Sequence, residues 1–345
     1  MYRLMQTNEE VFAAGPAVGP GAPWKRALAE AVRDPDELVD LLALPESLRE
    51  GARRAARRFP LVVPRGFLAR MRPGDPADPL LRQVLPLDAE EDCADGFTAD
   101  PVGDAQATIA PGLIQKYHGR VLLIAAGACA VNCRYCFRRE YPYGEAPRGL
   151  DSWRPALARI AADPSIHEVI LSGGDPLTLT DTALERLVLR LAEIPHVERL
   201  RVHTRLPVVI PERVTDSLLA LLRGTRLTPV MVVHANHPAE LDEACAGALG
   251  RLVDSGTPVL NQAVLLRGVN DDAGTLARLC ERLAELRVLP YYLHQLDPVR
   301  GAAHFHVSEA RGLEILADLR RRLPGYAVPR YVREVPGAAS KVEIG

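Results

Sequence analysis

The chain has 345 residues, 48% of them hydrophobic and 25% charged, with a formal net charge of −2 at pH 7. These values are typical of a globular protein with one large and one smaller domain, and they give no reason to expect direct nucleic-acid binding. No run approaches the roughly 20 apolar residues that a membrane span needs, and the N-terminus lacks the build of a signal peptide. We therefore expect a cytoplasmic protein without a membrane contact.

Residues 1–110 predict a helical N-terminal domain. Apolar residues at helical spacing occur in 24–44 and 48–59, with Pro/Gly-rich breaks between such stretches and no alternation of the kind that strands show. The basic run RRAARR at 53–58 could contact RNA or an acidic protein, although such a run is more often a solvated helix face.

Residues 111–325 alternate short β-branched runs with helix-length stretches, which predicts an α/β core of six βα units. The expected strands are 121–126, 168–172, 199–204, 229–234, 259–265 and 289–295. The expected helices are 152–163, 181–193, 212–223, 239–255, 272–287 and 308–322. The similar strand-to-strand intervals favour a partial, TIM-like (β/α)6 barrel over an open doubly wound sheet.

A cluster of polar residues follows the end of each expected strand. The cysteine cluster comes after the first strand, and the other clusters are SGGDP (172–176), HTRLP (203–207), HANHP (234–238), LLRGVNDD (265–272) and HQLDP (294–298). Parallel α/β barrels build their active sites at the C-terminal ends of their strands. We therefore predict the functional site at that end.

Three cysteines, Cys129, Cys133 and Cys136, lie within eight residues with the spacing C-x3-C-x2-C. In a reducing compartment they are better explained as metal ligands or catalytic groups than as disulfide partners. Three thiolates can hold three irons of a 4Fe–4S cluster and leave the fourth iron open to a substrate or cosubstrate. The alternative is a zinc site completed by His118 or another histidine, although zinc ligands usually come as two separated pairs.

This motif, with Tyr135 before its third cysteine and a strand before it, resembles the signature of the radical S-adenosylmethionine (SAM) superfamily. CRYCFRR, SGGDPL, RLPVVIPERVT, NHP, NQAVLLRGVND, YYLHQLD, AAHF and REVPGAASK occur in the order found in the lysine 2,3-aminomutase family. The phenylalanine of CRYCFRR and the segments PGDPADPLLRQVLP and PGLIQKYHGRVLL are most similar to the branch that supplies β-lysine for modifying elongation factor P.

The resemblance implies three cofactors: a 4Fe–4S cluster, SAM and pyridoxal 5′-phosphate (PLP). Lys341, in the C-terminal segment 326–345, occupies the place of the family lysine that forms a Schiff base with PLP. A lysine amine can condense with the cofactor aldehyde once its surroundings lower its pKa. Lys116 and Tyr117 match a family pair near the PLP phosphate, and Gln262 is a further candidate contact that could equally be scaffolding.

The SGGDP loop matches the family loop that contacts the amino group of SAM. Its residues Ser172, Gly173, Gly174 and Asp175 would allow close backbone approach and accept a hydrogen bond from an ammonium, although an ordinary strand-to-helix turn also uses such residues. His234 is a candidate contact of SAM and could equally be structural.

The resemblance assigns the substrate contacts to three residues. Arg138 matches the arginine that pairs with the carboxylate of the amino acid, for which a guanidinium fork is well suited. Asp297 and Glu334 match two acids that hold the side-chain ammonium of lysine, and such a pair would reject glutamate.

The implied activity is that of an isomerase that converts L-α-lysine to (R)-β-lysine. The implied partners are L-lysine, elongation factor P with its lysyl-ligase, and an electron donor such as flavodoxin or ferredoxin. The alternatives are a glutamate 2,3-aminomutase, a radical SAM maturase without PLP, and a non-enzymatic iron–sulfur or zinc protein that binds a translation factor.

Overall fold

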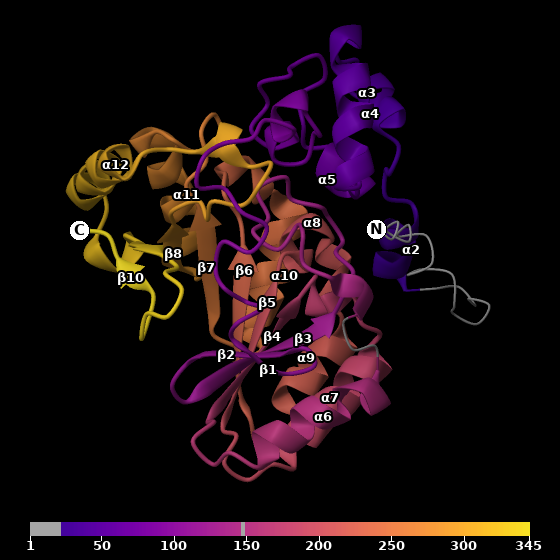
Figure 1. Ribbon diagram of the computed structural model, residues 1–345, viewed down its shortest axis with the longest axis vertical. Coiled ribbons are helices and arrows are strands. Elements are labelled where there is room, and N and C mark those ends of the chain that lie inside the picture. Colours follow the sequence, from indigo (N-terminus) through magenta and orange to yellow (C-terminus); the bar gives the residue numbers. More distant parts are fainter. Residues whose placement is uncertain (1–21, 146–148) are drawn as a thin grey trace.

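One ten-stranded sheet organises the computed structural model, which describes residues 22–145 and 149–345. Its strands lie side by side in chain order from β1 to β10, so that β1 and β10 are the two edges (Figure 1). Lumen-facing residues of the strands from β2 to β9 line a single cavity, which means that the sheet curves into a partial barrel. The predicted α/β fold class is confirmed.

The six central strands are parallel and match the six predicted strands to within a residue or two. They are β3 (Arg120–Ala126), β4 (Glu168–Gly173), β5 (Arg199–Thr204), β6 (Thr228–His234), β7 (Val259–Val264) and β8 (Leu289–His294). The βα rhythm of the sequence therefore predicted the core of the fold.

Six longer helices follow these strands. They are α6 (Leu150–Ala161), α7 (Asp181–Ala192), α9 (Asp216–Arg223), α10 (Glu243–Asp254), α11 (Ala273–Glu285) and α12 (Glu309–Arg322). The predicted starts at 212 and 239 are wrong, because a 3-10 turn precedes each of these two helices. The side chains of Thr215 and Asp242 accept backbone N–H groups and so fix the true starts of α9 and α10.

Shorter helical segments occupy the connections of the barrel. They are α8 (Leu206–Val209) and the 3-10 turns η4 (Tyr143–Glu145), η5 (Pro176–Thr178), η6 (Pro211–Arg213), η7 (Pro238–Glu240), η8 (Ala303–Phe305) and η9 (Gly325–Ala327). Within the described ranges, no helix has the length and apolar content that crossing a membrane requires.

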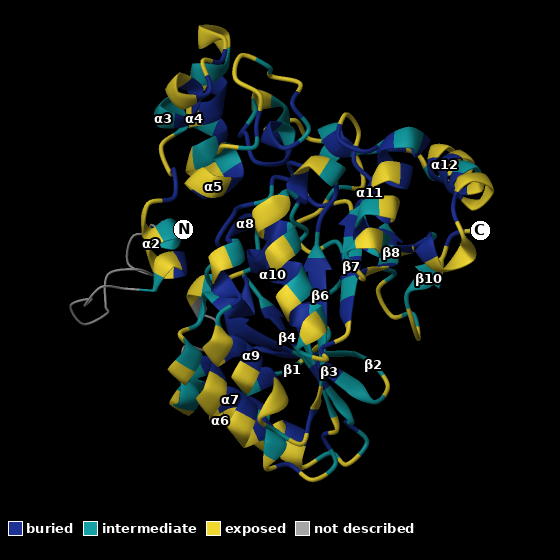
Figure 2. Ribbon diagram, turned by 180° about the vertical axis from the view of Figure 1, so that it is seen from behind, coloured by how far each residue is buried: buried dark blue, intermediate teal, exposed yellow. Residues whose placement is uncertain are grey.

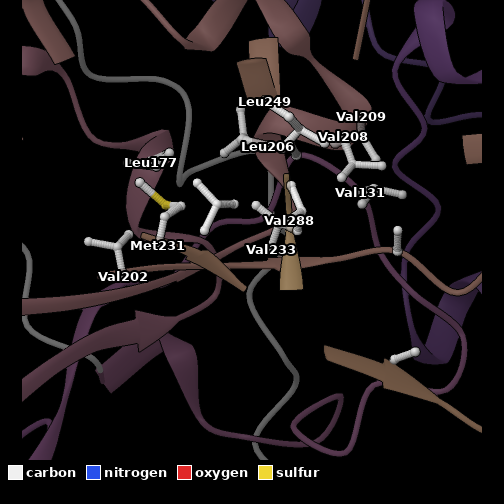
Figure 3. Close-up of a cluster of buried hydrophobic side chains, with 14 of the residues drawn as sticks. Val131, Leu177, Val202, Leu206, Val208, Val209, Met231, Val233, Leu249 and Val288 are labelled. Atoms are coloured by element: carbon white, nitrogen blue, oxygen red, sulfur yellow. The ribbon is translucent and has the colours of Figure 1, made fainter. Parts of the chain in front are cut away.

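Side chains alternate between the lumen and the helices along each central strand. In β5, Arg201 and His203 line the cavity, whereas Leu200 and Val202 are buried in the apolar core. Figure 2 shows the same division, with buried strands covered by helices whose outer faces are exposed. Figure 3 shows part of this outer core, including Leu177, Val202, Leu206, Val208, Met231, Val233 and Leu249. Apolar burial therefore stabilises the helix side and leaves the lumen for polar groups.

Two short strand pairs that the sequence did not predict extend the barrel at its edges. At one edge, β1 (Thr108–Ala110) pairs antiparallel with β2 (Leu113–Tyr117), and β2 pairs antiparallel with β3. At the other edge, β9 (Arg330–Arg333) pairs parallel with β8, and β10 (Val342–Glu343) pairs antiparallel with β9. The second pair carries the C-terminal segment to the lumen.

Short helices dominate the N-terminal part. They are α2 (Pro23–Ala29), α3 (Pro35–Leu41), α4 (Arg49–Arg58) and α5 (Arg65–Leu68), with the 3-10 turns η1 (Glu46–Leu48), η2 (Leu81–Gln83) and η3 (Asp88–Glu90) (Figure 1). The basic run lies on α4, where Arg53 pairs with Asp36 and Arg54 with Glu50 in solvent-exposed contacts. These contacts fit a solvated helix face.

Glu90 joins this N-terminal part to the loop that carries the cysteines. Its carboxylate accepts a hydrogen bond from Arg134 Nε at 2.7 Å and another from Arg139. Arg134 is fully buried and Glu90 is 2% exposed. Since a buried charge without a partner is costly, one carboxylate holds two guanidiniums of the cysteine loop in place.

We expect Glu90→Gln to lower the free energy of unfolding by about 3–5 kcal/mol, because it leaves two buried guanidiniums without their counter-charge. Urea unfolding of the purified protein would measure this change. Asp88→Asn is the matched control, since Asp88 pairs with Arg54 at an exposed position and should cost no more than about 1 kcal/mol. Equal losses in the two variants would contradict the role given to Glu90.

Candidate active site

A cavity of about 2450 Å³ extends from the lumen of the partial barrel to the N-terminal helix α2 and the end of α4. Every site residue predicted from the sequence lines it. These residues are Lys116, Tyr117, Cys129, Cys133, Cys136, Arg138, Ser172, Gly173, Gly174, Asp175, His234, Gln262, Asp297, Glu334 and Lys341. The fold therefore brings together residues that span most of the chain, while their individual roles stay predictions.

The three cysteines lie on the loop between β3 and α6 and face the cavity. Burial raises the pKa of the Cys129 thiol well above its usual value, and the charges of Cys136, Asp175 and Cys133 raise it further. Burial and then Cys133 raise the pKa of Cys136 to about 11. Burial and the neighbouring cysteines oppose the ionisation of Cys129 and Cys136, and bound irons would remove that opposition, which fits an iron cluster.

Tyr135, between the second and third cysteines, anchors the loop in a small apolar cluster. Its ring packs edge-on against Phe305 and stacks on His234, and its hydroxyl lies 2.7 Å from His234 Nε2. Burial and then the charge of Arg205 lower the pKa of His234 to about 3, so its imidazole is neutral. This placement favours the scaffolding role of His234. Gln262 lies opposite it on β7 and also lines the cavity.

The SGGDP loop lies against the start of the cysteine loop. Gly174 N–H donates to Ala126 O at 2.8 Å, and Asp175 N–H donates to Ala128 O at 2.7 Å. A Cβ on Gly174 would stand 2.3 Å from Ala128 O, and Gly173 has a φ of +115°, so both positions require glycine. The two loops can contact each other only through bare backbone at this point.

The Asp175 carboxylate is engaged by donors within the protein. It accepts from Thr204 Oγ1 at 2.7 Å, from Arg205 N–H at 2.7 Å and from Leu177 N–H at 3.0 Å. These bonds tie the loop after β4 to the loop after β5. The geometry favours a positioning role for this carboxylate, with the backbone of the loop as the surface available to a ligand.

Glu334 is the centre of a charged network in the lumen. Its carboxylate pairs with Lys341 Nζ, accepts from Tyr117 OH at 2.7 Å and lies 3.5 Å from Lys116 Nζ. Burial is the largest single effect and opposes the ionisation of Glu334, but Lys341, Tyr117 and Lys116 together outweigh it and hold the pKa of the carboxyl below its usual value. Glu334 is therefore an anion at neutral pH.

Asp104 continues this network toward Arg138. Its two carboxylate oxygens lie 2.7 Å from Lys116 Nζ and 2.6 Å from Arg138 Nε. Burial opposes its ionisation, yet Arg138 and Lys116 hold the pKa of Asp104 below its usual value. Arg138 is 7% exposed, and its Nη1 makes only a 3.4 Å contact with Ser172 Oγ. The two terminal N–H groups of the Arg138 guanidinium are therefore available to an anion.

Asp297, in the loop that follows β8, lines the cavity without an ion-pair partner among the described residues. Burial raises the pKa of its carboxyl to about 7, because this effect and the charge of Glu334 exceed the opposing effects of Lys341, Lys116 and Arg138. A cationic ligand would stabilise the ionised form of this carboxyl, because it would supply the missing counter-charge.

The sequence did not reveal several residues that lie in the cavity wall or directly behind it. Asp104 had no signal in the sequence, since it lies in an irregular segment before β1. His203 and His294 lay within recognised polar clusters but were not chosen. Burial first, and then Arg201 for His203 or Lys341 for His294, lower the pKa of these imidazoles well below the usual value. Both are neutral groups of the cavity wall.

Residues 123–280 match the family model described as the radical SAM superfamily. This match covers the cysteine loop and most of the parallel strands and helices. Together with the cavity at the strand ends, it defines the protein as a radical SAM enzyme, a class that uses a 4Fe–4S cluster and SAM.

Sequence relatives identify the family within the radical SAM class to which this chain belongs. The L-lysine 2,3-aminomutase of Escherichia coli (strain K12) is 47% identical over 93% of this chain and 94% of that protein. The L-lysine 2,3-aminomutase of Haemophilus influenzae is 47% identical over 92% and 94%, and that of Clostridium subterminale is 35% identical over 93% and 77%. The chain belongs to the L-lysine 2,3-aminomutase family and is an isomerase. The non-enzymatic alternative is therefore wrong.

Among solved structures, a radical SAM methyltransferase from Sphaerobacter thermophilus superposes with a TM-score of 0.41. The superposition covers 64% of this chain and 68% of that chain, at 20% sequence identity. The family assignment rests on the sequence relatives.

We expect Gly174→Ala to reduce the iron that the protein binds. The added Cβ would collide with backbone at Ala128, and displacing the cysteine loop would cost about 1–3 kcal/mol of strain. Iron and sulfide per chain after anaerobic reconstitution would measure the effect. Gly247→Ala, with nothing within 4 Å of its Cβ, should keep the full iron content. Full content in both variants would contradict the close contact between the two loops.

Proposed function

We propose that the protein converts L-α-lysine to (R)-β-lysine as a PLP-dependent radical SAM aminomutase of the cytoplasm. One observation carries the proposal. Lys341, Arg138 and the acids Asp297 and Glu334 line the same cavity as the three cysteines. A reactive amine, a carboxylate receptor and an ammonium receptor thus share one lumen with the site of radical generation.

The cavity fits PLP in two respects. Lys341 is one of only three lysines in the chain, and its Nζ points into the lumen, 6.0 Å from the centre of the Tyr292 ring. Lys116, Arg120 and Arg201 line the same cavity, and cations of this kind suit a phosphate. PLP, when bound, supplies an aromatic ring that can carry the amino group of the substrate and delocalise an unpaired electron.

The cysteines and the loop after β4 fit the other two groups. The cysteines would hold the cluster, and the backbone of the SGGDP loop would lie beside SAM. The cluster and SAM together supply a reductive cleavage that generates a hydrogen-abstracting radical. The task of the protein is to fix the substrate against that radical and to exclude water, since small displacements cost large factors in rate.

Arg138 would bind the carboxylate of the substrate. Its Nε is held by Asp104 at 2.6 Å and its guanidinium lies over the ring of Phe137, 4.6 Å from the centroid, so the fork is fixed in direction. A fixed planar fork suits a bidentate carboxylate. Asp104 is then a positioning residue, because it orients Arg138 without reaching the substrate itself.

Asp297 and Glu334 would bind the ε-ammonium of lysine. Glu334 now pairs with the Lys341 ammonium, and it loses that cation once the Lys341 amine is committed to PLP. The substrate ammonium is the natural replacement, and Asp297 gains the partner that it lacks. Glutamate would bring a second carboxylate to these acids, and the repulsion in a buried site disfavours the glutamate aminomutase alternative.

We further propose that the β-lysine serves the modification of elongation factor P by its lysyl-ligase, with a flavodoxin or ferredoxin as electron donor. The support is the sequence resemblance to that branch and the 94% coverage of the relatives from E. coli and H. influenzae. Transfer of the product to elongation factor P by the ligase in a coupled assay would test this step.

The test of the activity uses anaerobically reconstituted protein with L-lysine, PLP, SAM and dithionite, and detects β-lysine by mass spectrometry. We expect product from the wild type and at least a hundredfold loss in Lys341→Ala and Asp297→Ala, on the order of 3 kcal/mol of transition-state stabilisation. Asp254→Ala, at an exposed position on α10 outside the cavity, should remain active.

Borohydride reduction of the PLP-loaded protein followed by peptide mapping would locate the modified lysine among the three in the chain. Cleavage of SAM without conversion of lysine would leave the radical SAM class intact and refute the substrate. PLP fixed to Lys25 or Lys116 would refute the role of Lys341.

We expect the affinity of the enzyme for lysine to rise with pH through at least 7. Asp297 must be ionised to bind an ammonium, and burial raises its pKa to about 7 while the Lys341 ammonium is present. The loss of that cation to PLP would raise the pKa further, and protonation weakens binding about tenfold per pH unit below the pKa. The pH profile of kcat/KM would report this ionisation. The Asp297→Asn variant should have a low kcat/KM at every pH and should lack the rise with pH. If kcat/KM of this variant rose with pH as in the wild type, Asp297 would be excluded as the ionising group.

A further inference from the structure

Arg205 makes a contact with the cysteine loop that the proposed reaction does not use. It lies directly after β5, in the HTRLP segment, and its Nη1 donates to Cys133 Sγ at 2.7 Å. The residue is 6% exposed. Two side chains reach this thiol, because the Tyr135 hydroxyl also hydrogen-bonds to Cys133, but Arg205 is the cationic donor of the two. Cys136 instead receives the backbone N–H of Arg138.

The guanidinium of Arg205 is fixed on its other side. Its Nη2 donates to Glu240 Oε2 at 2.8 Å and to Gln83 Oε1 at 2.7 Å. Glu240 is fully buried and itself accepts from Asn236 N–H at 2.8 Å. The guanidinium carbon also lies 5.4 Å from the ring centre of Phe67. The N–H group that faces Cys133 therefore has a fixed direction.

The ion pair with Glu240 determines how Arg205 can affect the cysteine loop. Because the carboxylate neutralises the guanidinium, the pair brings little net charge to the cysteine loop. What remains is a directed hydrogen bond to one sulfur. Hydrogen bonds to the sulfurs of an iron–sulfur cluster, together with the charge of the cluster and its exposure to solvent, set its reduction potential.

We propose that Arg205 tunes the reduction potential of the cluster through its hydrogen bond to Cys133 Sγ. Reduction adds an electron to a site of thiolate ligands, and a hydrogen bond to one of those thiolates stabilises the added negative charge. Arg205 thus raises the potential and makes the cluster easier to reduce. The inference concerns the cluster alone and does not depend on the identity of the substrate or on PLP.

The test is a redox titration of the reconstituted protein, without lysine or PLP, monitored by electron paramagnetic resonance of the reduced cluster. We expect Arg205→Met to shift the midpoint potential to a more negative value. Arg205→Lys keeps a donor that is less well directed, so it should give a smaller shift in the same direction. The iron content and the thermal unfolding of each variant would be measured alongside.

Arg213→Lys is the matched control. Arg213 is likewise a buried arginine that follows β5, but it pairs with Asp181 and lies over the ring of Trp24. Its substitution should cost stability and leave the potential unchanged. Wild-type potentials in both Arg205 variants would overturn the proposal. Loss of iron from both, with Arg213→Lys fully loaded, would also overturn it and assign Arg205 to cluster assembly.

Discussion

The site depends on the neutralisation of buried arginines in the loop that carries the cysteines. Arg134 and Arg139 share the carboxylate of Glu90, and Arg138 pairs with Asp104. Removing one partner of such a buried pair typically costs several kcal/mol. Both carboxylates come from the segment before the first parallel strand. The barrel alone therefore does not supply the charges that its own cysteine loop requires, and the N-terminal part is a structural component of the site.

The same kind of interaction connects the two edges of the sheet. The strands run in one order from β1 to β10, and those edges carry opposite parts of the lumen wall. Tyr117 and Lys116, on β2, both contact Glu334, which follows β9. Side chains thus join the two ends of a partial barrel where the described strands form no backbone ladder. Lys341 reaches the lumen because β10 folds back on β9.

The sequence predicted the core of the fold because six buried strands leave strong apolar signals between helices of ordinary length. It did not predict β1, β2, β9 and β10, which have only two to five residues and no rhythm of their own. The motif residues were found because they follow strand ends or match a family pattern. Glu90 and Asp104 were missed for a physical reason: a buried charge selects its partner in space, and here the arginine partners stand 34 or more residues away along the chain.

On the proposed function, the charges of the lumen also explain the choice of substrate. Arg138 keeps an open fork beside Asp104, and Asp297 has no counter-charge of its own. The carboxylate and the distal ammonium of lysine would each meet the group that needs them. A substrate with a neutral side chain of the same length as that of lysine would leave Asp297 protonated. A substrate with an acidic side chain would be repelled by Glu334. Selection then follows from the cost of burying unpaired charge.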